Sequence, residues 1–366
     1  MGRGVSRYGI VDRNTPITTS VKETAGGLPA VISAWKHGVS KMGFVGSTVS
    51  LGKANQKRGF DCPGCAWPDP KHRSPFEYCE NGAKAVSDEA TIKTIPDSFW
   101  QEHSIHALGR KSDQWLNSQG RLSRPLILER DSNHYVPSDW DRAIGIIAKS
   151  LDALEDPNDA YFYTSGRASN EAAYLWQLLA RQYGTNNLPD CSNMCHESSG
   201  VALNESIGIG KGTVRLEDFD KADLIVIVGQ NPGTNHPRML SALKSAKKSG
   251  ASVLSINPLK ETGMRRFRHP QSPIDMLGAG TQISDDHVNI KINGDMALFR
   301  AIGSIILDKG SHDPDFINLN TTGFLDYAKI AQKIDWDLIE HLTGQDRGRI
   351  NEISDYFCRS RRTIVC

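Results

Sequence analysis

A strand–helix–strand pattern between residues 221 and 258 places the strongest constraint on the fold. The stretch KADLIVIVG (221–229) is almost continuously apolar, which is typical of a strand buried on both faces. A polar loop, the helical stretch MLSALKSAKKSG and a second apolar stretch, ASVLSINP (251–258), follow in turn. Two apolar strands joined through a helix favour neighbouring parallel strands. The sequence therefore predicts an α/β fold with a doubly wound, Rossmann-like parallel sheet.

Further elements extend this pattern on both sides. We expect a strand at DAYFYT (159–164), then a turn in which Ser169 is the N-cap of a helix that ends near Gly184. HVNIKI (287–292) predicts another strand, and a helix follows it. The final residues, RTIV, look like the beginning of one more strand.

Residues 1 to about 54 are predicted to be an extended lead-in around one helix, residues 55–120 to be irregular, and the pattern to change from residue 121 onward. A helix is expected near residues 28–42, and short helices such as 81–91 interrupt an irregular region. The stretch RPLILERDSNHYVPS (124–138) reads as a hairpin-like piece. Ser138 is expected to cap the helix that follows, DWDRAIGIIAKSLDAL, because hydroxyl side chains satisfy free amides at a helix start.

The segment DCPGCAWPDPKH (61–72) needs something other than packing to organise it. Its three prolines oppose a helix or a central strand, and it has few aliphatic residues. Cys62 and Cys65 have the spacing that lets two thiolates reach one metal through a tight turn, and Cys79 follows them. This pattern favours a metal centre, with a structural zinc site or unrelated thiols as alternatives. The fourth ligand of an iron–sulfur cluster would be His72, His103, Asp61 or an external group.

A second cysteine pattern lies in PDCSNMCHESSG (189–200). Cys191 and Cys195 are followed directly by His196 and Glu197. If this segment opens a helix, the positive helix N-terminus favours the thiolate form of Cys195, and His196 is placed to carry protons. A zinc site or inert packing cysteines are the alternatives.

The loop GQNPGTNHP (229–237) follows the first buried strand, at the end where open α/β sheets bind ligands. Gly229 and Gly233 allow the backbone to approach a phosphate. The hydrogen-bonding side chains of the loop are Asn231, Thr234, Asn235 and His236. A polar turn before a helix is the alternative. The glycine-rich stretch GIGKG (208–212) has no strand before it and no apolar helix after it, so we predict a connector there.

Composition narrows the class of protein. A chain of 366 residues with 38% hydrophobic residues suggests about two or three domains with a sizeable core. A net charge of +1 and a pI near 7.6 argue against charge-driven binding of nucleic acid or of a membrane surface. The sequence shows no membrane segment and no secretory signal, which predicts a cytoplasmic protein whose cysteines are thiols or metal ligands.

The order of these motifs resembles the molybdopterin-dependent oxidoreductases of the DMSO reductase superfamily, in particular their formate-dehydrogenase-like, YdeP-type branch. The blocks that carry the resemblance are DCPGCAWPDPKH, CENGAK, TSGRASNEA, CSNMCHESSGVALNESIG, DLIVIVGQNPGTNHP, SINPLKETG and INGDMALF. They cover most of residues 25–366. The resemblance implies an irregular iron–sulfur N-terminal region followed by molybdopterin-binding domains.

Roles for individual residues follow from the resemblance alone. The ligands of a [4Fe-4S] cluster would be Cys62, Cys65 and Cys79. Lys84 would lie between the cluster and the pterin. Cys195 would ligate molybdenum, and His196 beside it would handle protons. The residues that match segments gripping a molybdenum bis(molybdopterin guanine dinucleotide) cofactor are Arg167, Ser169, Asn170, Gln230, Asn231, Gly233, Asn235, His236, Asn257, Gly294 and Asp295.

Two departures from the family pattern stand out. The usual cluster set has four cysteines, whereas this segment has three, and Lys84 has an unusual offset from the nearest cysteine. Full-length relatives are much longer, so the resemblance implies an N-terminal fragment without the C-terminal part of the family fold. We then expect the chain alone to bind cofactor poorly and to turn over little substrate. Stable formate oxidation by the purified chain would contradict that expectation.

The resemblance also gives an organisation and a reaction. The expected regions are an N-terminal extension (1–54), an iron–sulfur region (55–120), the first part of an α/β domain (121–190) and a guanine-dinucleotide-binding domain (191–366). The expected reaction is two-electron oxidation of formate or a similar small substrate at molybdenum. Electrons would leave through the cluster to an electron-transfer partner of unknown identity. Reduction of nitrate or another oxyanion, and an inactive metal-binding fragment, are the alternatives.

Overall fold

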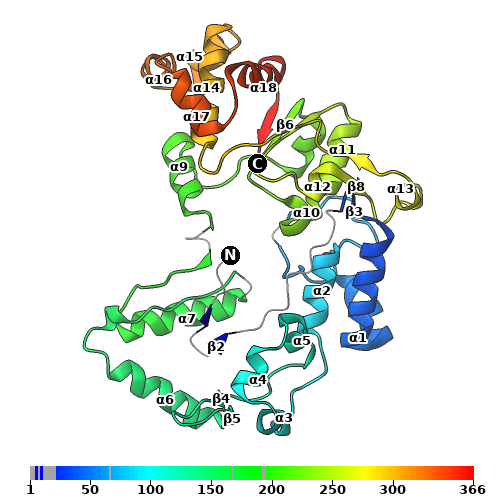
Figure 1. Cartoon of the computed structure of the whole chain (residues 1–366), viewed down its shortest axis with the longest axis vertical. Coiled ribbons are helices and arrows are strands. Elements are labelled where there is room, and N and C mark those ends of the chain that lie inside the picture. The colour runs from blue at the N-terminus through cyan, green and yellow to red at the C-terminus, as the bar shows by residue number, and fades with distance from the viewer. Residues whose placement is uncertain (1–4, 7–8, 11–21, 66, 167, 192–194) are drawn as a thin grey trace. The chain divides into compact units, whose positions relative to one another are not determined.

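The computed structural model describes residues 5–6, 9–10, 22–65, 67–166, 168–191 and 195–366 (Figure 1). These residues form two compact units. The first unit contains residues 38–47 and 86–213 with the short strands β1 (Val5–Ser6) and β2 (Gly9–Ile10). The second unit contains the described residues up to His37, together with residues 48–85 and 214–366.

A four-stranded parallel sheet forms the centre of the second unit. Its strands are β6 (Leu224–Val228), β7 (Ser252–Ile256), β10 (Asp286–Val288) and β11 (Thr363–Val365). They lie in the order β10-β7-β6-β11, and every neighbouring pair is parallel. The predicted strands at 221–229 and 251–258 and the predicted strand near the end of the chain are therefore confirmed. The strand predicted at 287–292 is shorter and begins one residue earlier.

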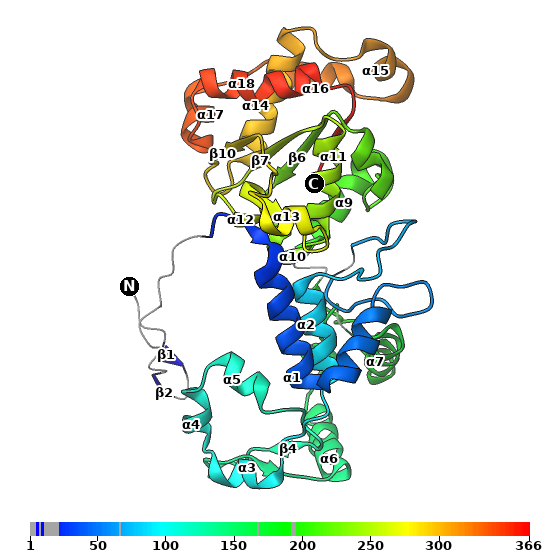
Figure 2. The same cartoon turned by 90° about the vertical axis from the view of Figure 1, so that its right-hand side faces the viewer.

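Helices cover both faces of this sheet, as expected for a doubly wound fold (Figure 2). One face packs against α11 (Met239–Lys248), and the other packs against α14 (Asp295–Asp308), α17 (Trp336–Thr343) and α18 (Arg347–Arg359). Strand β6 shows why both faces are apolar: Ile225 and Ile227 enter the first core, while Leu224 and Val226 enter the second.

Smaller elements complete the second unit. The short strands β3 (Ala25–Gly26), β8 (Arg266–Arg268) and β9 (Thr281–Gln282) form a three-stranded sheet. The remaining helices are η2 (Leu216–Lys221), α10 (Pro232–Asn235), α12 (Thr262–Arg265), α13 (Pro273–Leu277), α15 (Pro314–Asn320) and α16 (Phe324–Ala331).

Helix α1 (Gly27–Lys53) is longer than the helix predicted near residues 28–42. Gly43 has a non-helical backbone (φ 73°), and the helix resumes after it. The second stretch, FVGSTVSLGK, has weak helix formers, so propensity gave no reason to extend the prediction. Burial supports it instead, because Ser47 and Leu51 are 0% and 2% exposed.

The chain between α1 and α2 (Glu80–Glu89) contains no helix among its described residues, as its prolines predict. Short helices follow, as expected for this region. They are α3 (Asp97–Glu102), α4 (Ile105–Gly109) and α5 (Asp113–Ser118).

The first unit then continues with a hairpin and a series of helices. Strands β4 (Leu126–Ile127) and β5 (Val136–Pro137) pair in antiparallel fashion, which confirms the hairpin-like prediction. The further elements whose bounds lie wholly within the described residues are α6 (Trp140–Asp152), η1 (Pro157–Asp159), α7 (Asn170–Tyr183) and α9 (Glu197–Ile207).

The prediction that Ser138 caps α6 is wrong by one residue. The N-cap is Asp139, whose side chain accepts a hydrogen bond from the Arg142 amide at 2.7 Å. Both residue types cap well, so the sequence alone did not separate them. The cap at Ser169 and the left-handed end of α7 at Gly184 are confirmed.

The strand predicted at 159–164 is also wrong. Residues 161–163 have no regular structure, and the pairing that exists is an isolated parallel bridge between Thr164 and Asp190. Single hydrogen bonds, such as Phe162 N–H to the Asn187 carbonyl at 2.9 Å, hold the segment without a ladder.

Helices α6 and α7 expose large apolar side chains in this structure. Ile144 and Ile147 on α6 are 57% and 59% exposed, and Tyr174 and Leu175 on α7 are 60% and 64% exposed. Both helices are amphipathic in sequence, so these residues form the apolar sides that a packed helix normally covers.

Candidate functional site

The carboxyl ends of three neighbouring strands bring together most of the predicted cofactor residues in the second unit. The loop 229–237 follows β6, Asn257 follows β7, and Gly294 and Asp295 lie a few residues beyond β10. Because parallel strands end at one edge, segments far apart in sequence meet there. The structure thus places Gln230, Asn231, Gly233, Asn235 and His236 at the same sheet edge as the later residues.

The strand order marks where a ligand would bind along this edge. The chain runs from β6 through β7 to β10 in one direction and returns on the other side of β6 with β11. The topological switch point therefore lies beside β6. Open α/β sheets bind ligands in the crevice at such a point. The loop that leaves β6 there is the predicted binding loop, 229–237.

The loop after β6 combines an open glycine with a buried polar atom. Gly229 has a positive φ of 66°, and a Cβ there would meet no atom within 4 Å. The buried side-chain Oε1 of Gln230 has no hydrogen-bond partner among the described residues. A buried acceptor of this kind calls for an explanation, and a bound ligand donor is one. The loop therefore fits a polar ligand at its backbone and side chains.

Gly233 has a different structural reason to be glycine. A Cβ on Gly233 would lie 3.0 Å from the Cα of Gly263, because the single-turn helices α10 and α12 pack backbone to backbone. The structure thus gives Gly233 a packing role. Its predicted approach to a phosphate stays a prediction.

Asn257 and Gly294 shape the neighbouring parts of the edge. Asn257 is 6% exposed, its N–H donates to the Val288 carbonyl at 3.0 Å, and its Oδ1 accepts from the Leu259 amide at 2.8 Å. A Cβ on Gly294 would lie 2.8 Å from the Leu342 carbonyl oxygen. Both residues fix turns that follow strands, and Asp295 begins α14 directly after Gly294.

The cysteine segment 62–79 also lies in the second unit, and two of its thiols converge on one glycine. A Cβ built on Gly82 would lie 2.8 Å from Cys62 Sγ and 3.6 Å from Cys79 Sγ. Each sulfur accepts a backbone N–H bond at 3.3 Å, Cys62 from Gly64 and Cys79 from Gly82. Hydrogen bonds to cysteine sulfur are among the features that tune iron–sulfur clusters.

Burial dominates the electrostatics of the third cysteine. It raises the pKa of the Cys79 thiol, and the negative charges of Cys65 and Cys62 raise it further, while hydrogen bonds from the Gly82 and Asn81 amides oppose the shift. Three thiols close enough to influence one another suit a shared positive centre. Among the described residues, no three His, Cys, Asp or Glu side chains are grouped closely enough to hold a single metal ion.

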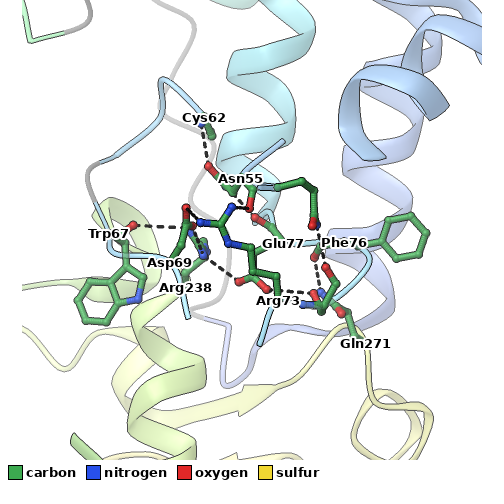
Figure 3. Close-up of polar contacts among 11 residues, drawn as sticks. Asn55, Cys62, Trp67, Asp69, Arg73, Phe76, Glu77, Arg238 and Gln271 are labelled. Carbon is green, nitrogen blue, oxygen red and sulfur yellow. Dashed lines mark hydrogen bonds and ion pairs between the residues drawn. The ribbon is translucent and has the colours of Figure 1, made fainter. Parts of the chain in front are cut away.

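A polar network surrounds the cysteine segment and includes two residues that the sequence analysis missed (Figure 3). Asn55, which is 5% exposed with φ 56°, accepts the Cys62 amide at Oδ1 at 2.8 Å. Arg238 donates to Asp69 Oδ1 and Glu77 Oε1, both at 2.8 Å. No motif singled out Asn55. Arg238 directly follows the predicted binding loop, and its position there was the one available signal.

Lys84 and Asn81 lie on the helix that follows the cysteines. Lys84 Nζ pairs with Glu80 at 2.7 Å, one turn earlier on α2, and the lysine side chain is 38% exposed. Asn81 Nδ2 donates to the carbonyl of Thr234 at 2.7 Å, which connects the first turn of α2 to the loop after β6. The predicted position of Lys84 between a cluster and a pterin is not tested by these contacts.

The second cysteine pattern lies in the first unit. Cys191 Sγ accepts the Gly166 amide at 3.2 Å, and a Cβ on Gly166 would lie 3.0 Å from that sulfur. This contact suits the packing interpretation of Cys191. Cys195 is exposed, and His196 is the N-cap of α9, so the expected helix does begin here.

The other predicted residues of this unit lie at the start of α7. Ser169 is its N-cap and accepts the Ala172 amide at 3.2 Å, and Asn170 is its first residue. Arg167 and residues 192–194 lie outside the described part of the chain. The glycine-rich stretch at 208–212 follows the left-handed end of α9 at Gly208, and no strand precedes it. It therefore lacks the setting of a nucleotide loop, as predicted.

A model of a known protein family matches more than half of this sequence. The model described as molybdopterin oxidoreductase matches residues 121–335. The chain belongs to the molybdopterin oxidoreductase family. A molybdenum–pterin cofactor is the group that this family implies, and the buried Gln230 oxygen and open Gly229 at the sheet edge fit a polar ligand of that kind.

Relatives place this molybdopterin oxidoreductase within its family. It is 46% identical to an uncharacterized oxidoreductase of Mycobacterium tuberculosis over 94% of this chain and 45% of that protein. It is 43% identical to the protein YdeP of Escherichia coli over 95% of this chain and 47% of YdeP. Formate dehydrogenase H of Escherichia coli is more distant, at 27% identity over 67% of this chain and 33% of that enzyme. The predicted superfamily and YdeP-type branch are thereby confirmed.

A solved structure supports the fold. Acetylene hydratase from Pelobacter acetylenicus superposes with a TM-score of 0.52 at 18% identity, covering 66% of this chain and 31% of the hydratase. The predicted α/β architecture with a parallel sheet is confirmed. This molybdopterin oxidoreductase spans less than half the length of the M. tuberculosis protein and of YdeP. Within its described residues, no helix is long and apolar enough to cross a membrane.

Proposed function

We propose that the chain binds a molybdopterin guanine dinucleotide at the carboxyl edge of its sheet and a [4Fe-4S] cluster at its cysteine segment. In this proposal the chain is part of an oxidoreductase of formate dehydrogenase type, which removes two electrons from formate or a similar small substrate. The observation that carries the proposal is the meeting of the loops after β6, β7 and β10 at one edge, beside the topological switch point.

The cysteine segment would hold the cluster through its three thiols. The convergence of Cys62 and Cys79 on Gly82, and the amide hydrogen bonds to both sulfurs, support this role. Cys65 would be the third ligand. The fourth position would be filled by another side chain or an external group. His103 is already engaged in its own unit, where its ring stacks on Phe99 at 4.3 Å.

The cofactor would supply the two-electron redox chemistry, while this chain's residues bind and orient it. Gln230, Asn231, Asn235, His236 and Asn257 would offer amide and imidazole hydrogen bonds to its polar groups. Ser169, Asn170 and Arg167 would have the same task, as the family resemblance implies. Cys195 would be the thiolate that holds molybdenum, because a soft sulfur ligand suits this metal. His196 beside it would accept a proton.

Two distantly related proteins favour formate over other substrates. Formate dehydrogenase H and a putative formate dehydrogenase of Bacillus subtilis match at 27% and 28% identity. The adjacent Cys195 and His196 fit that branch. The domain division at residues 54, 120 and 190, a cytoplasmic location and a separate electron-transfer partner are part of the same proposal.

Metal analysis tests the proposal on anaerobically purified chain. We expect about four iron atoms per chain with a broad brown absorbance, the content of one [4Fe-4S] cluster. The Cys79→Ser variant should lose most of this iron. Cys358→Ser is the matched control, because Cys358 is half-buried in α18 and belongs to neither cysteine pattern.

The outcomes separate the interpretations. Molybdenum together with iron would support both sites, and iron without molybdenum would support the cluster while leaving the sheet edge unproven. Zinc in place of iron would reject the redox proposal in favour of a metal-binding fragment. Nitrate-dependent rather than formate-dependent electron flow in a molybdenum-loaded preparation would move the substrate assignment to an oxyanion.

A further inference from the structure

Five residues around the cysteine segment form a closed ring of hydrogen bonds through their side chains and two backbone carbonyls, which we call the arginine ring (Figure 3). Its members are Asn55, Asp69, Arg73, Glu77 and Arg238. Arg238 donates to Asp69 Oδ1 and to Glu77 Oε1 at 2.8 Å each. All five residues belong to the second unit.

The rest of the ring closes through Asn55. Arg73 pairs with Asp69 Oδ2 at 3.2 Å and donates to the Asn55 carbonyl at 2.9 Å. Asn55 Nδ2 then donates to the Glu77 carbonyl at 2.7 Å, and Asn55 Oδ1 accepts the Cys62 amide at 2.8 Å. The ring is therefore hydrogen-bonded, through Asn55, to the backbone of Cys62.

The ring also balances charge in a largely buried place. Two guanidinium groups face two carboxylates, and the side chains of Arg238, Asp69 and Glu77 are 11%, 17% and 15% exposed. Burial acts to lower the pKa of Arg238, but the hydrogen bonds to Asp69 and Glu77 outweigh it and raise that pKa. Arg238 is thus charged, and its removal would leave net negative charge beside the cysteines.

Arg238 connects two parts of the unit that are far apart in sequence, since its partners Asp69 and Glu77 lie 169 and 161 residues before it. It is the N-cap residue of α11 and follows the loop after β6, whereas Asp69 and Glu77 lie inside the cysteine segment. A second tie, from Asn81 to the Thr234 carbonyl, joins the same two parts. The cysteine segment is therefore anchored to the loop that follows β6.

We propose that the arginine ring, with Arg238 as its central positioning residue, holds the cysteine segment in its ligand-ready shape before any metal binds and offsets negative charge at the site. The inference rests on the proposed function in that it names the cluster as the group to be positioned. Its structural part concerns this chain alone and is testable without metal.

Hydrogen exchange on the metal-free chain tests the structural part. In Arg238→Met, backbone amides of residues 60–80, including the Cys62 amide, should exchange roughly tenfold faster than in the unaltered chain. Arg349→Met is the matched control, because Arg349 pairs with Asp286 and Glu352 in the same unit, at 2.7 and 3.0 Å. Unchanged exchange in Arg238→Met, or equal acceleration of residues 60–80 in the control, would overturn the proposal.

The reduction potential of a reconstituted cluster tests the charge. Arg238→Met should shift it to a more negative value, because uncompensated carboxylates disfavour the added electron. Adding Glu77→Gln to Arg238→Met restores neutrality and should return the potential towards its original value, although a further contact is lost. Arg238→Lys keeps the charge but loses the planar guanidinium, whose Nη2 donates to both carboxylates while its Nη1 donates to the Trp67 carbonyl at 3.4 Å. It should therefore preserve the potential, while residues 60–80 should exchange as fast as in Arg238→Met.

These results separate the inference from the proposed function. If the unaltered chain takes up no iron, the proposed cluster fails, while the exchange experiment still decides whether the ring holds the segment. If iron binds and the potential is the same in every variant, the charge role of Arg238 is wrong.

Discussion

At the residue scale, the surroundings of the cysteines depend on contacts that spacing does not encode. The cysteine pattern predicted a metal segment, but its neighbours Asn55 and Arg238 carry no motif. Gly82 is the sharpest case, since its backbone lies against Cys62, twenty residues earlier in the sequence. A sequence lists the thiols but not the side chains that hold them, because those come from elsewhere in the chain.

The close contact at Gly82 predicts the effect of one added methyl group. In Gly82→Ala the new Cβ would lie 2.8 Å from Cys62 Sγ, so the sulfur must shift, and overpacking of this kind costs about 1–3 kcal/mol. We expect iron content measured after anaerobic purification to fall several-fold.

Gly52→Ala is the control for that measurement. A Cβ on Gly52, near the end of α1, would meet no atom within 4 Å, and alanine there should stabilise the helix by about 0.5–1 kcal/mol. Equal iron content in Gly82→Ala and Gly52→Ala would show that the sulfurs have room to move.

At the element scale, the sequence predicted the strands that are buried on both faces and the helix that has clear caps. The strands β6 and β7 were visible because both faces are apolar, and α7 was visible because its cap at Ser169 and its end at Gly184 frame it. The strand predicted at 159–164 does not form, because this segment makes single hydrogen bonds and one isolated bridge rather than a continuous ladder with a neighbouring strand. The second half of α1 was missed because packing rather than propensity supports it.

Helix α14 offers a direct test of how much the second core contributes. Leu298 is fully buried, whereas Met296, two residues earlier on the same helix, is 85% exposed. Leu298→Ala should lower the free energy of unfolding by about 2–5 kcal/mol, while Met296→Ala should change it by less than about 0.5 kcal/mol. Urea unfolding followed by far-ultraviolet circular dichroism measures both, and similar losses would contradict the assigned faces of α14.

At the scale of the whole molecule, the sequence predicted the sheet edge that carries the candidate site, but not the partners of its residues. The strand–helix–strand pattern predicts a candidate ligand loop after the buried strand, because parallel strands end at one carboxyl edge, and the structure places the loop 229–237 at that edge. Strand order, which sets the switch point beside β6, came from the return of β11, and no local pattern contains that information. The roles of Cys195, His196 and Arg167 remain predictions from the family resemblance.

Two half-buried histidines predict an acid-sensitive second unit. Burial lowers the pKa of His269, helped by the charges of Lys244 and Lys248 and opposed by Glu77. Burial likewise lowers the pKa of His287, helped by Lys260, Arg265 and Arg349 and opposed by Asp286. The unfolded chain then binds more protons than the folded one, so stability is fully present above the ordinary histidine pKa of about 6.5 and is lost as pH falls through it.

Melting curves at pH about 7.5 and about 5.5 check this sign. The unaltered chain should melt at a lower temperature at the acid pH, and the variant with His269→Gln and His287→Gln should show a smaller difference. The carboxylates whose pKa values are lowered, such as Asp286, titrate below this window and do not confuse it. An identical drop in both proteins would mean that other groups set the acid response.

The exposed apolar sides of α6 and α7 have a practical consequence for handling the chain. Ile144, Ile147, Tyr174 and Leu175 offer a folded surface to which environment-sensitive dyes adhere. Such a dye should already fluoresce with the native chain, so a thermal scan by dye uptake would start from a high baseline and understate the transition. Intrinsic tryptophan fluorescence would follow the loss of structure without that interference, because tryptophans such as Trp67, whose ring lies 5.8 Å from that of Phe219, leave a packed environment on unfolding.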